Sequence, residues 1–189
     1  IPFWSIQHYL GDTDNIQMAG ELIFLLSQNR KFYGSIFMDE WSPDKTFDKN
    51  NRNWFGYQAG LLFDNIITMQ DELVLEYTWT DARIYRHRFE VNDFYSHGYP
   101  IGFWAGPHAE EIFFSYTFTK YSFDYAISLS NAKRGLFSDL VDQYATQIIN
   151  RYDKLVENKF FIELGIVKSI YKDFTFQINV SLVDWSNGG

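Results

Sequence analysis

The chain contains no cysteine, which excludes thiolate chemistry, disulfide frameworks and cysteine-ligated metal sites. It has no apolar run near the 18 or more residues of a membrane-spanning helix, so a helical membrane protein is excluded. Lys and Arg together number 16 against 24 Asp and Glu, giving a net charge of -8, which argues against a nucleic-acid surface built from clustered cations. With only 4 prolines among 189 residues and 46% hydrophobic residues, the chain is not a disordered one.

Aromatic residues are abundant instead. They make up 20% of the sequence, as 19 Phe, 13 Tyr and 6 Trp, yet the mean hydropathy is only -0.27. The apolar side chains must therefore be interleaved with polar ones.

The interleaving has a period of two, which is typical of β-strands with one apolar and one polar face. Eight segments of about 9 to 11 residues follow it, each long enough to cross a bilayer at a tilt. They are 16–26, 32–40, 55–64, 72–80, 110–119, 121–130, 159–170 and 173–183.

The connections between these segments alternate strictly between short and long. The short ones are 27–30, 65–71, 120 and 171–172, and the long ones are 41–54, 81–109 and 131–158. Tight turns on one side and long loops on the other are typical of a transmembrane β-barrel. Residues 136–155, within the third long loop, are predicted to form a short helix. Tryptophans flank the long loops as an interfacial girdle would: Trp41, Trp54, Trp79, Trp104 and Trp185.

A water-soluble β-sandwich or lipocalin-like barrel would show the same alternation with its apolar face turned inward. The long, uniform strands and the almost purely large apolar and aromatic character of one face favour the membrane. The opposite face is predicted to carry carboxylates and amides: Glu21, Asp39, Gln58, Asp64, Glu76, Glu111, Asp124, Glu163 and Gln177.

Two stretches go beyond this pattern. One is 1–15, with His8-Tyr9-Leu10-Gly11-Asp12; the other runs through Glu76-Tyr77-Thr78, Tyr85-Arg86-His87 and His97-Gly98 to Gly106-Pro107 followed by Glu111. In this order the elements resemble the C-terminal part of bacterial outer-membrane barrels of the Wzi-type capsule-assembly family, in the variety found in Bacteroidetes-like bacteria. The resemblance covers most of the chain and implies a barrel in the bacterial outer membrane that binds surface polysaccharide and helps to keep capsule attached.

The implied partners are capsular or other surface polysaccharide, outer-membrane lipid and lipopolysaccharide, with other envelope proteins as further candidates and no nucleic acid. Members of that family are longer barrels. An eight-stranded barrel can close by itself, but glycines and carboxylates on the inward face would fill a narrow lumen poorly. We therefore expect 1–189 to be a single barrel region that is part of a larger barrel.

Most of the unusual residues lie in the second long loop. Arg, Asn and Asp side chains beside aromatic rings suit sugar recognition, because hydroxyls take paired hydrogen bonds and Arg can hold a uronate carboxylate. The predicted polysaccharide-binding residues are Arg83, Arg86, His87, Arg88, Asn92, Asp93, His97 and Trp104. The alternative is a charge network that fixes the loop in the barrel mouth, with Arg86 and Arg88 paired to Glu76, Glu90 or Glu111; both can hold at once.

Other chemistry has little support. The spacing of His87, His97 and His108 matches no metal motif, and 12–15 reads as a turn stabilised by Asx side chains rather than a calcium loop. No nucleophile elbow or oriented triad occurs. The sequence thus predicts a binding protein without catalytic residues, metal or cofactor. The alternatives are a porin or transporter with an acidic, cation-favouring lumen and, less supported, a barrel enzyme.

Overall fold

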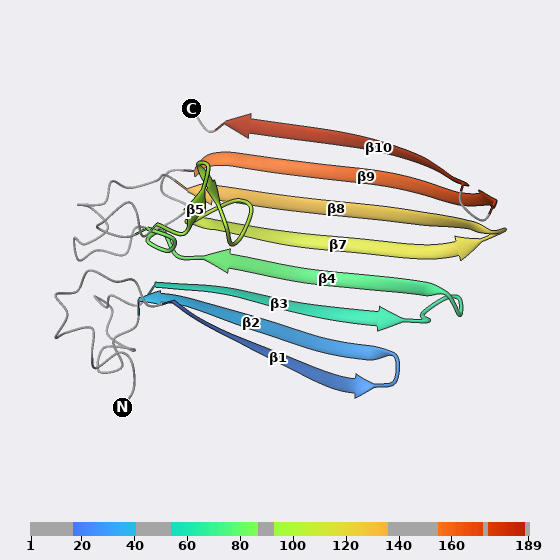
Figure 1. Cartoon of the computed structure of the whole chain (residues 1–189), viewed down its shortest axis with the longest axis horizontal. Helices are drawn as coiled ribbons and strands as arrows, with labels where there is room; N and C mark the ends of the chain where they lie inside the picture. Colours follow the sequence, from blue (N-terminus) through green and yellow to red (C-terminus); the bar gives the residue numbers. More distant parts are fainter. Residues whose placement is uncertain (1–16, 41–53, 87–92, 136–154, 172–173, 188–189) are drawn as a thin grey trace.

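The computed structural model describes residues 17–40, 54–86, 93–135, 155–171 and 174–187. Eight long strands form one antiparallel sheet in which each strand pairs with its neighbour along the chain (Figure 1). In sheet order they are β1 (Met18–Ser27), β2 (Arg30–Glu40), β3 (Trp54–Asp64), β4 (Asp71–Thr80), β7 (Ala109–Lys120), β8 (Phe123–Gly135), β9 (Leu155–Tyr171) and β10 (Phe174–Asn187). The second long loop contributes a small hairpin of β5 (Tyr95–Ser96) and β6 (Tyr99–Pro100).

All eight predicted strands are confirmed, with shifted ends. The strand predicted from residue 121 begins at Phe123, because Tyr121 and Ser122 both have positive φ (54° and 61°) and form a two-residue turn. Positive φ at both central positions matches the twist of a hairpin. The third long loop is shorter than predicted, since β8 runs to Gly135 and β9 starts at Leu155. The helix predicted at 136–155 falls almost wholly outside the described residues, and its last residue, Leu155, is the first residue of β9.

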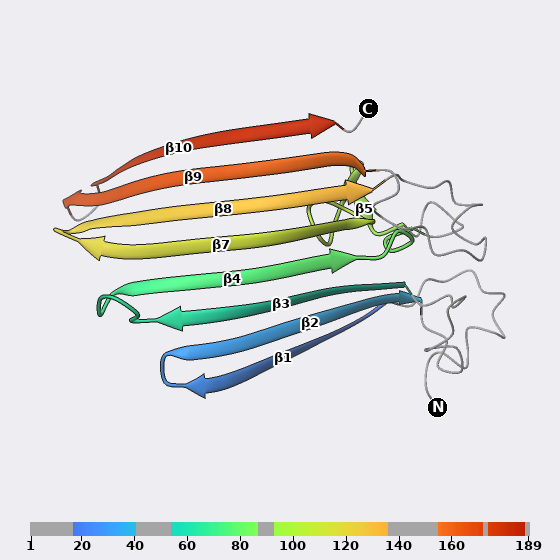
Figure 2. The same ribbon diagram turned by 180° about the vertical axis from the view of Figure 1, so that it is seen from behind.

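The sheet is an open, all-β meander. Strands β1 and β10 are its two edges and do not pair with each other (Figures 1 and 2). The antiparallel architecture follows the prediction, and a closed eight-stranded barrel is not formed by the described residues. None of the described residues belongs to a helix long and apolar enough to span a membrane.

The register assigns the alternating side chains to two faces, as predicted. One continuous row is Leu75, Phe114, Leu129, Ile162 and Leu182 on successive strands β4 to β10. We call its side of the sheet the apolar face. Many of its large side chains are exposed, among them Leu22 at 52%, Ile112 at 64% and Val180 at 62%.

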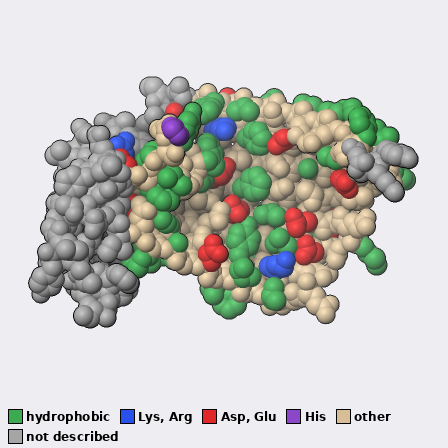
Figure 3. Space-filling model, in the orientation of Figure 1, with side chains coloured by type: hydrophobic (Ala, Val, Ile, Leu, Met, Phe, Trp, Pro, Cys, Tyr) green, Lys and Arg blue, Asp and Glu red, His purple; other side chains and the backbone are tan. Residues whose placement is uncertain are grey.

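The polar face is the other side of the sheet. A row that crosses seven strands defines it: Ser35, Gln58, Thr78, Glu111, Ala132, Lys159 and Trp185. Figure 3 shows this face, with acidic side chains scattered among apolar ones. The carboxylates predicted for one face therefore do share it.

The second long loop packs on the polar face, in front of the sheet in Figure 1 and behind it in Figure 2. The backbone N–H of Tyr85 donates to Oδ2 of buried Asp39 at 2.7 Å, and the Tyr85 ring lies 5.6 Å from that of Phe37. Fully buried Ile84 reaches Gly56 of β3, where an added Cβ would lie 3.1 Å from its Cδ1. The largest fully buried side chains are thus found where the loop meets the sheet.

The return of the loop is fixed by Thr80 at the end of β4. Its buried hydroxyl donates to the carbonyl of Gly106 at 2.8 Å, and it accepts a hydrogen bond from the N–H of Ala109 at 3.0 Å. Both ends of the loop are therefore held against the sheet by buried polar contacts, which stay satisfied away from water.

The prediction that the tryptophans form an interfacial girdle fails for three of the four that the structure describes, because they do not lie on the apolar face. Trp79 lies on the apolar face, stacked on Tyr57 at 4.9 Å. Trp54 and Trp185 alternate onto the polar face, and Trp104 lies in the loop that covers it. The prediction failed because tryptophans near a loop were assigned to lipid without regard to the side on which the alternation places them. Trp41 lies outside the described residues.

Candidate functional site

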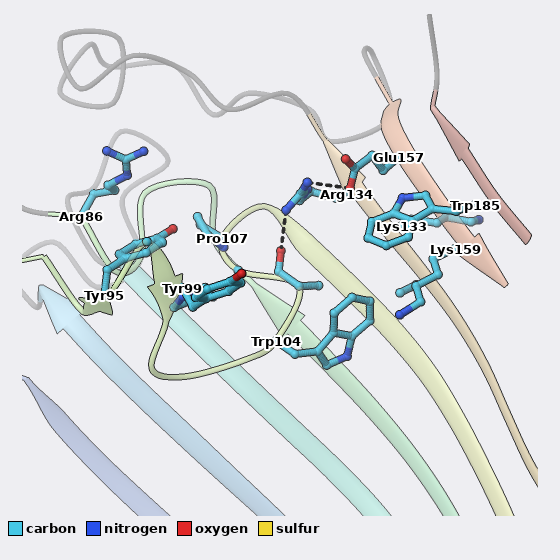
Figure 4. Close-up of a pocket in the computed structure, with 15 residues that line it drawn as sticks. Arg86, Tyr95, Tyr99, Trp104, Pro107, Lys133, Arg134, Glu157, Lys159 and Trp185 are labelled. Atoms are coloured by element: carbon cyan, nitrogen blue, oxygen red, sulfur yellow. Dashed lines mark hydrogen bonds and ion pairs between the residues drawn. The ribbon is translucent and has the colours of Figure 1, made fainter. Parts of the chain in front are cut away.

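A pocket of about 710 Å³ opens on the polar face at the long-loop end of the sheet, between the second long loop and strands β8 to β10 (Figure 4). Pockets of 300 to 1,000 Å³ lined by aromatic groups with a few polar ones are typical ligand sites. The lining residues are Arg86, Tyr95, Gly98, Tyr99, Pro100, Trp104, Ala105, Gly106, Pro107, Ala132, Lys133, Arg134, Glu157, Lys159 and Trp185.

The loop side of the pocket is built by the β5–β6 hairpin. Its two-residue turn, His97-Gly98, has positive φ at both positions (51° and 84°), which a tight hairpin requires. The turn leaves Tyr99 75% exposed and directs Tyr95 toward Arg86, whose guanidinium carbon lies 5.6 Å from the ring centre. Burial raises the pKa of Tyr95 although Arg86 opposes the shift, so the phenol stays a neutral hydrogen-bonding group at physiological pH.

The sheet side of the pocket carries an ion pair that ties it to the loop. Arg134 of β8 and Glu157 of β9 are cross-strand partners, and their side chains approach to 2.6 Å. The same guanidinium donates to the carbonyl of Ala105 at 3.5 Å, as the dashed lines in Figure 4 show. Arg134 therefore links the loop to two strands.

At the other end of the pocket a lysine lies between two indoles. The Nζ of Lys159 is 4.4 Å from the ring centre of Trp104 and 5.2 Å from that of Trp185. Both distances are within the range of cation–π attraction. Trp185 is the cross-strand partner of Lys159, and Trp104 is oriented by donating its indole N–H to Glu111 at 2.8 Å. We call Trp104, Lys159 and Trp185 the Lys159 clamp.

The structure brings two of the eight predicted site residues, Arg86 and Trp104, into the pocket lining. Asp93 forms an ion pair with Arg86, with 3.7 Å between Oδ2 and Nη1. Arg83 is not among the lining residues and pairs with Asp81 at 2.9 Å. His97 occupies the hairpin turn beside the pocket. His87, Arg88 and Asn92 lie outside the described residues.

The alternative prediction was a charge network in which Arg86 and Arg88 pair with Glu76, Glu90 or Glu111, and the ion pair found for Arg86 has a different partner. Arg86 contacts Asp93 within the loop. Two of the carboxylates predicted to pair with Arg86 have other donors. Glu76 accepts a hydrogen bond from Tyr33, and Glu111 accepts hydrogen bonds from Trp104 and Ser130. Glu90 lies outside the described residues.

Sequence reasoning missed most of the sheet side of the pocket. The period-two alternation assigns Lys159 and Trp185 to the polar face, and both lie next to a long loop. These two facts could have placed them in the pocket. Arg134 and Glu157 lay inside the predicted third loop, so no register was available to pair them. Tyr95 and Tyr99 flank His97-Gly98, and recognising that dipeptide as a hairpin turn would have brought them together.

No protein-family model matches the chain, and no curated protein matches it either. Among solved structures the chain is similar to Wzi of Escherichia coli, an outer membrane protein involved in group 1 capsule assembly and described as a carbohydrate-binding β-barrel. The likeness has a TM-score of 0.48 and 13% sequence identity, and it covers 90% of this chain and 48% of that one. The chain thus spans about half the length of Wzi. Membership of the Wzi-type family, which the sequence motifs suggest, stays a prediction.

Proposed function

We propose that this chain is part of an outer-membrane β-barrel that binds surface polysaccharide in the pocket at its long-loop end and so supports capsule assembly or attachment. It acts as a binding protein without catalysis. The observation that carries the proposal is the pocket itself, in which exposed aromatic rings and cations converge beside the long loops. In outer-membrane barrels the long loops face the outside of the cell.

The exposed apolar face supports the membrane location. Large contiguous apolar surfaces are rare on soluble monomers and mark membrane or protein contacts. The described part of the second long loop packs on the polar face and leaves the apolar face bare. Lys168 is on the apolar face, near the tight turns, where its ammonium lies 3.9 Å from the ring centre of Phe123. Near an interface a lysine can extend its charge toward water.

The chemistry of the pocket supports a sugar ligand. Trp104 and Trp185 are 47% and 54% exposed, and an exposed indole face can stack on the apolar face of a pyranose ring. Tyr95, Tyr99 and Arg134 add hydroxyl and guanidinium groups that can bond to sugar hydroxyls. A shallow site that combines ring stacking with several polar groups suits a segment of a long glycan.

A porin or transporter is the second candidate, because acidic groups occur on the polar face. An acidic lumen would favour cations. Against it stands the loop that Asp39 and Thr80 hold on this face, which would narrow a lumen lined by the polar face. Conductance in planar bilayers separates the two candidates: we expect no steady cation current from the binding protein.

Binding to a glycan array tests the proposed function. We expect surface glycans to bind the purified protein in detergent micelles, and we expect Trp104→Ala and Arg86→Ala to reduce binding while the content of β-structure is unchanged. A protein that binds no glycan on the array, or that binds equally well after both substitutions, contradicts the proposal.

A further inference from the structure

Within the described part of the chain, the Lys159 clamp contains a cation that makes no ion pair. Among the residues that the structure describes, no carboxylate lies within 4.0 Å of the Lys159 ammonium, and its contacts are with the rings of Trp104, Phe161 and Trp185. Two other cations that line the pocket, Arg134 and Arg86, have acidic partners, since Arg134 pairs with Glu157 and Arg86 lies near Asp93. Lys133 also borders the pocket, but its register places it on the apolar face.

The aromatic rings hold the ammonium without neutralising it. Cation–π contacts stabilise a positive charge by the ring quadrupoles and leave its net charge in place. Lys159 is half-buried, so its charge is partly shielded from water and acts more strongly on a nearby anion than an exposed lysine would. In a chain of net charge -8 this is a local positive site.

We infer that the Lys159 clamp recognises the carboxylate of an acidic sugar, such as a uronic acid, within the glycan. This deepens the proposed function and rests on it. In a hexuronic acid the carboxylate is attached to C5, next to ring C–H groups that can stack on an indole. A ring seated on Trp104 or Trp185 therefore brings its carboxylate toward Lys159. One uncompensated positive charge matches a carboxylate monoanion better than a phosphate dianion.

The matched ligands for a test are tetragalacturonic acid and its methyl ester, which share stereochemistry and length and differ in charge. Isothermal titration is done on the protein in detergent micelles at low salt. We expect the acid to bind at least about tenfold more tightly than the ester, as a charge-assisted hydrogen bond would give. Raising the salt concentration should weaken binding of the acid and leave that of the ester unchanged.

Substitutions test whether the preference for the acid over the ester depends on the Lys159 clamp. Lys159→Gln should remove most of the preference for the acid while the ester keeps its affinity within about twofold. Lys159→Arg, which keeps the charge, should retain much of the preference. The matched control is Lys31→Gln, which removes the same charge from the polar face at the tight-turn end of β2 and should leave the preference intact.

Each other outcome overturns the inference. Equal affinity for acid and ester in the unsubstituted protein would refute it while the proposed glycan binding stands. A preference that survives Lys159→Gln would place carboxylate recognition elsewhere, and tighter binding of sulfated cellotetraose would reassign the site to sulfate esters. If neither galacturonate binds, the inference fails, and neutral sugars on the glycan array then decide separately whether the protein binds glycans at all.

Discussion

The hydroxyl of Tyr33 on β2 donates a hydrogen bond to Oε2 of Glu76 on β4 at 2.7 Å, across the intervening strand β3. The strand between them carries Gly60, the cross-strand partner of both residues. The Tyr33 ring covers this glycine so closely that an added Cβ would overlap the Cζ of the ring. Gly60 therefore allows one aromatic side chain to bridge three strands on the polar face.

Gly60→Ala should destabilise the sheet by about 1 to 3 kcal/mol, because the Tyr33 ring must move and its bond to Glu76 is strained or lost. The measurement is urea-induced unfolding in detergent micelles, followed by tryptophan fluorescence. Gly20→Ala is the control, since an added Cβ there meets only Ile36 at an ordinary 3.6 Å. Equal unfolding midpoints for the two variants would show that the ring has room to move.

Asp71→Ala should destabilise the turn between β3 and β4. The Asp71 carboxylate accepts hydrogen bonds from the N–H groups of three successive residues, 66–68, at 2.6 to 2.8 Å, and from the hydroxyl of Tyr116 at 2.9 Å. Loss of this acceptor leaves several donors unsatisfied and should cost about 3 kcal/mol. Unfolding by urea measures the effect.

The control for this turn is Asp64→Ala, at its other end, because the Asp64 carboxylate accepts no hydrogen bond from the described residues. Its unfolding midpoint should remain close to that of the unsubstituted protein. A similar decrease in the free energy of unfolding in both variants would mean that the stability depends on negative charge in this region and not on the hydrogen bonds of the turn.

Asp39→Ala should loosen the second long loop from the polar face. The carboxylate accepts the backbone N–H of Tyr85 in a buried position, and a buried N–H without a partner is costly. We expect limited proteolysis to cut between residues 81 and 108 at least several times faster. Asp124→Ala, which removes an exposed contact with Thr119 at the tight-turn end, should not change the rate; unchanged cleavage in Asp39→Ala would show that other contacts suffice.

Trp104→Phe should weaken glycan binding more than Trp185→Phe. Both variants keep an aromatic ring near Lys159, but only Trp104 donates its indole N–H to a described residue, Glu111. Losing that bond releases the ring from its orientation, and a loss of about 1 kcal/mol corresponds to roughly a fivefold weaker affinity. Titration with the best ligand from the glycan array measures both variants. The reverse order would make Trp185 the principal stacking surface.

Much of the fold could be predicted from the sequence because each strand has one apolar and one polar side. The assignment of residues to faces stays correct even where a strand begins later than predicted. Strand β8 is an example: Tyr121 continues the alternation of aromatic residues but belongs to the turn, so the turn could not be recognised from the pattern. Closure could not be predicted, since alternation along a strand says nothing about which strands meet at the edges.

The site was harder to predict than the fold. Arg86 and Trp104 were found because the loop is rich in unusual residues. The contact of Lys159 with Trp185 depends on the register between β9 and β10, and that of Lys159 with Trp104 depends on how the loop folds back. The position of Trp185 could have been predicted from the alternation alone. It was assigned to the lipid-facing side, but Val183, two residues earlier, belongs to the polar face, so Trp185 does too.

The loop on the polar face is fastened at Tyr85 and again at Gly106 and Ala109, through Asp39 and Thr80. The hairpin between these points can therefore exchange its side chains without disturbing the strands beneath it, as surface loops on a rigid scaffold generally do. If the pocket binds glycan as proposed, a few substitutions near Tyr95, Tyr99 and Trp104 would be enough to change which sugars it accepts. The residues that contact a ligand could then change faster in evolution than the strands that support them.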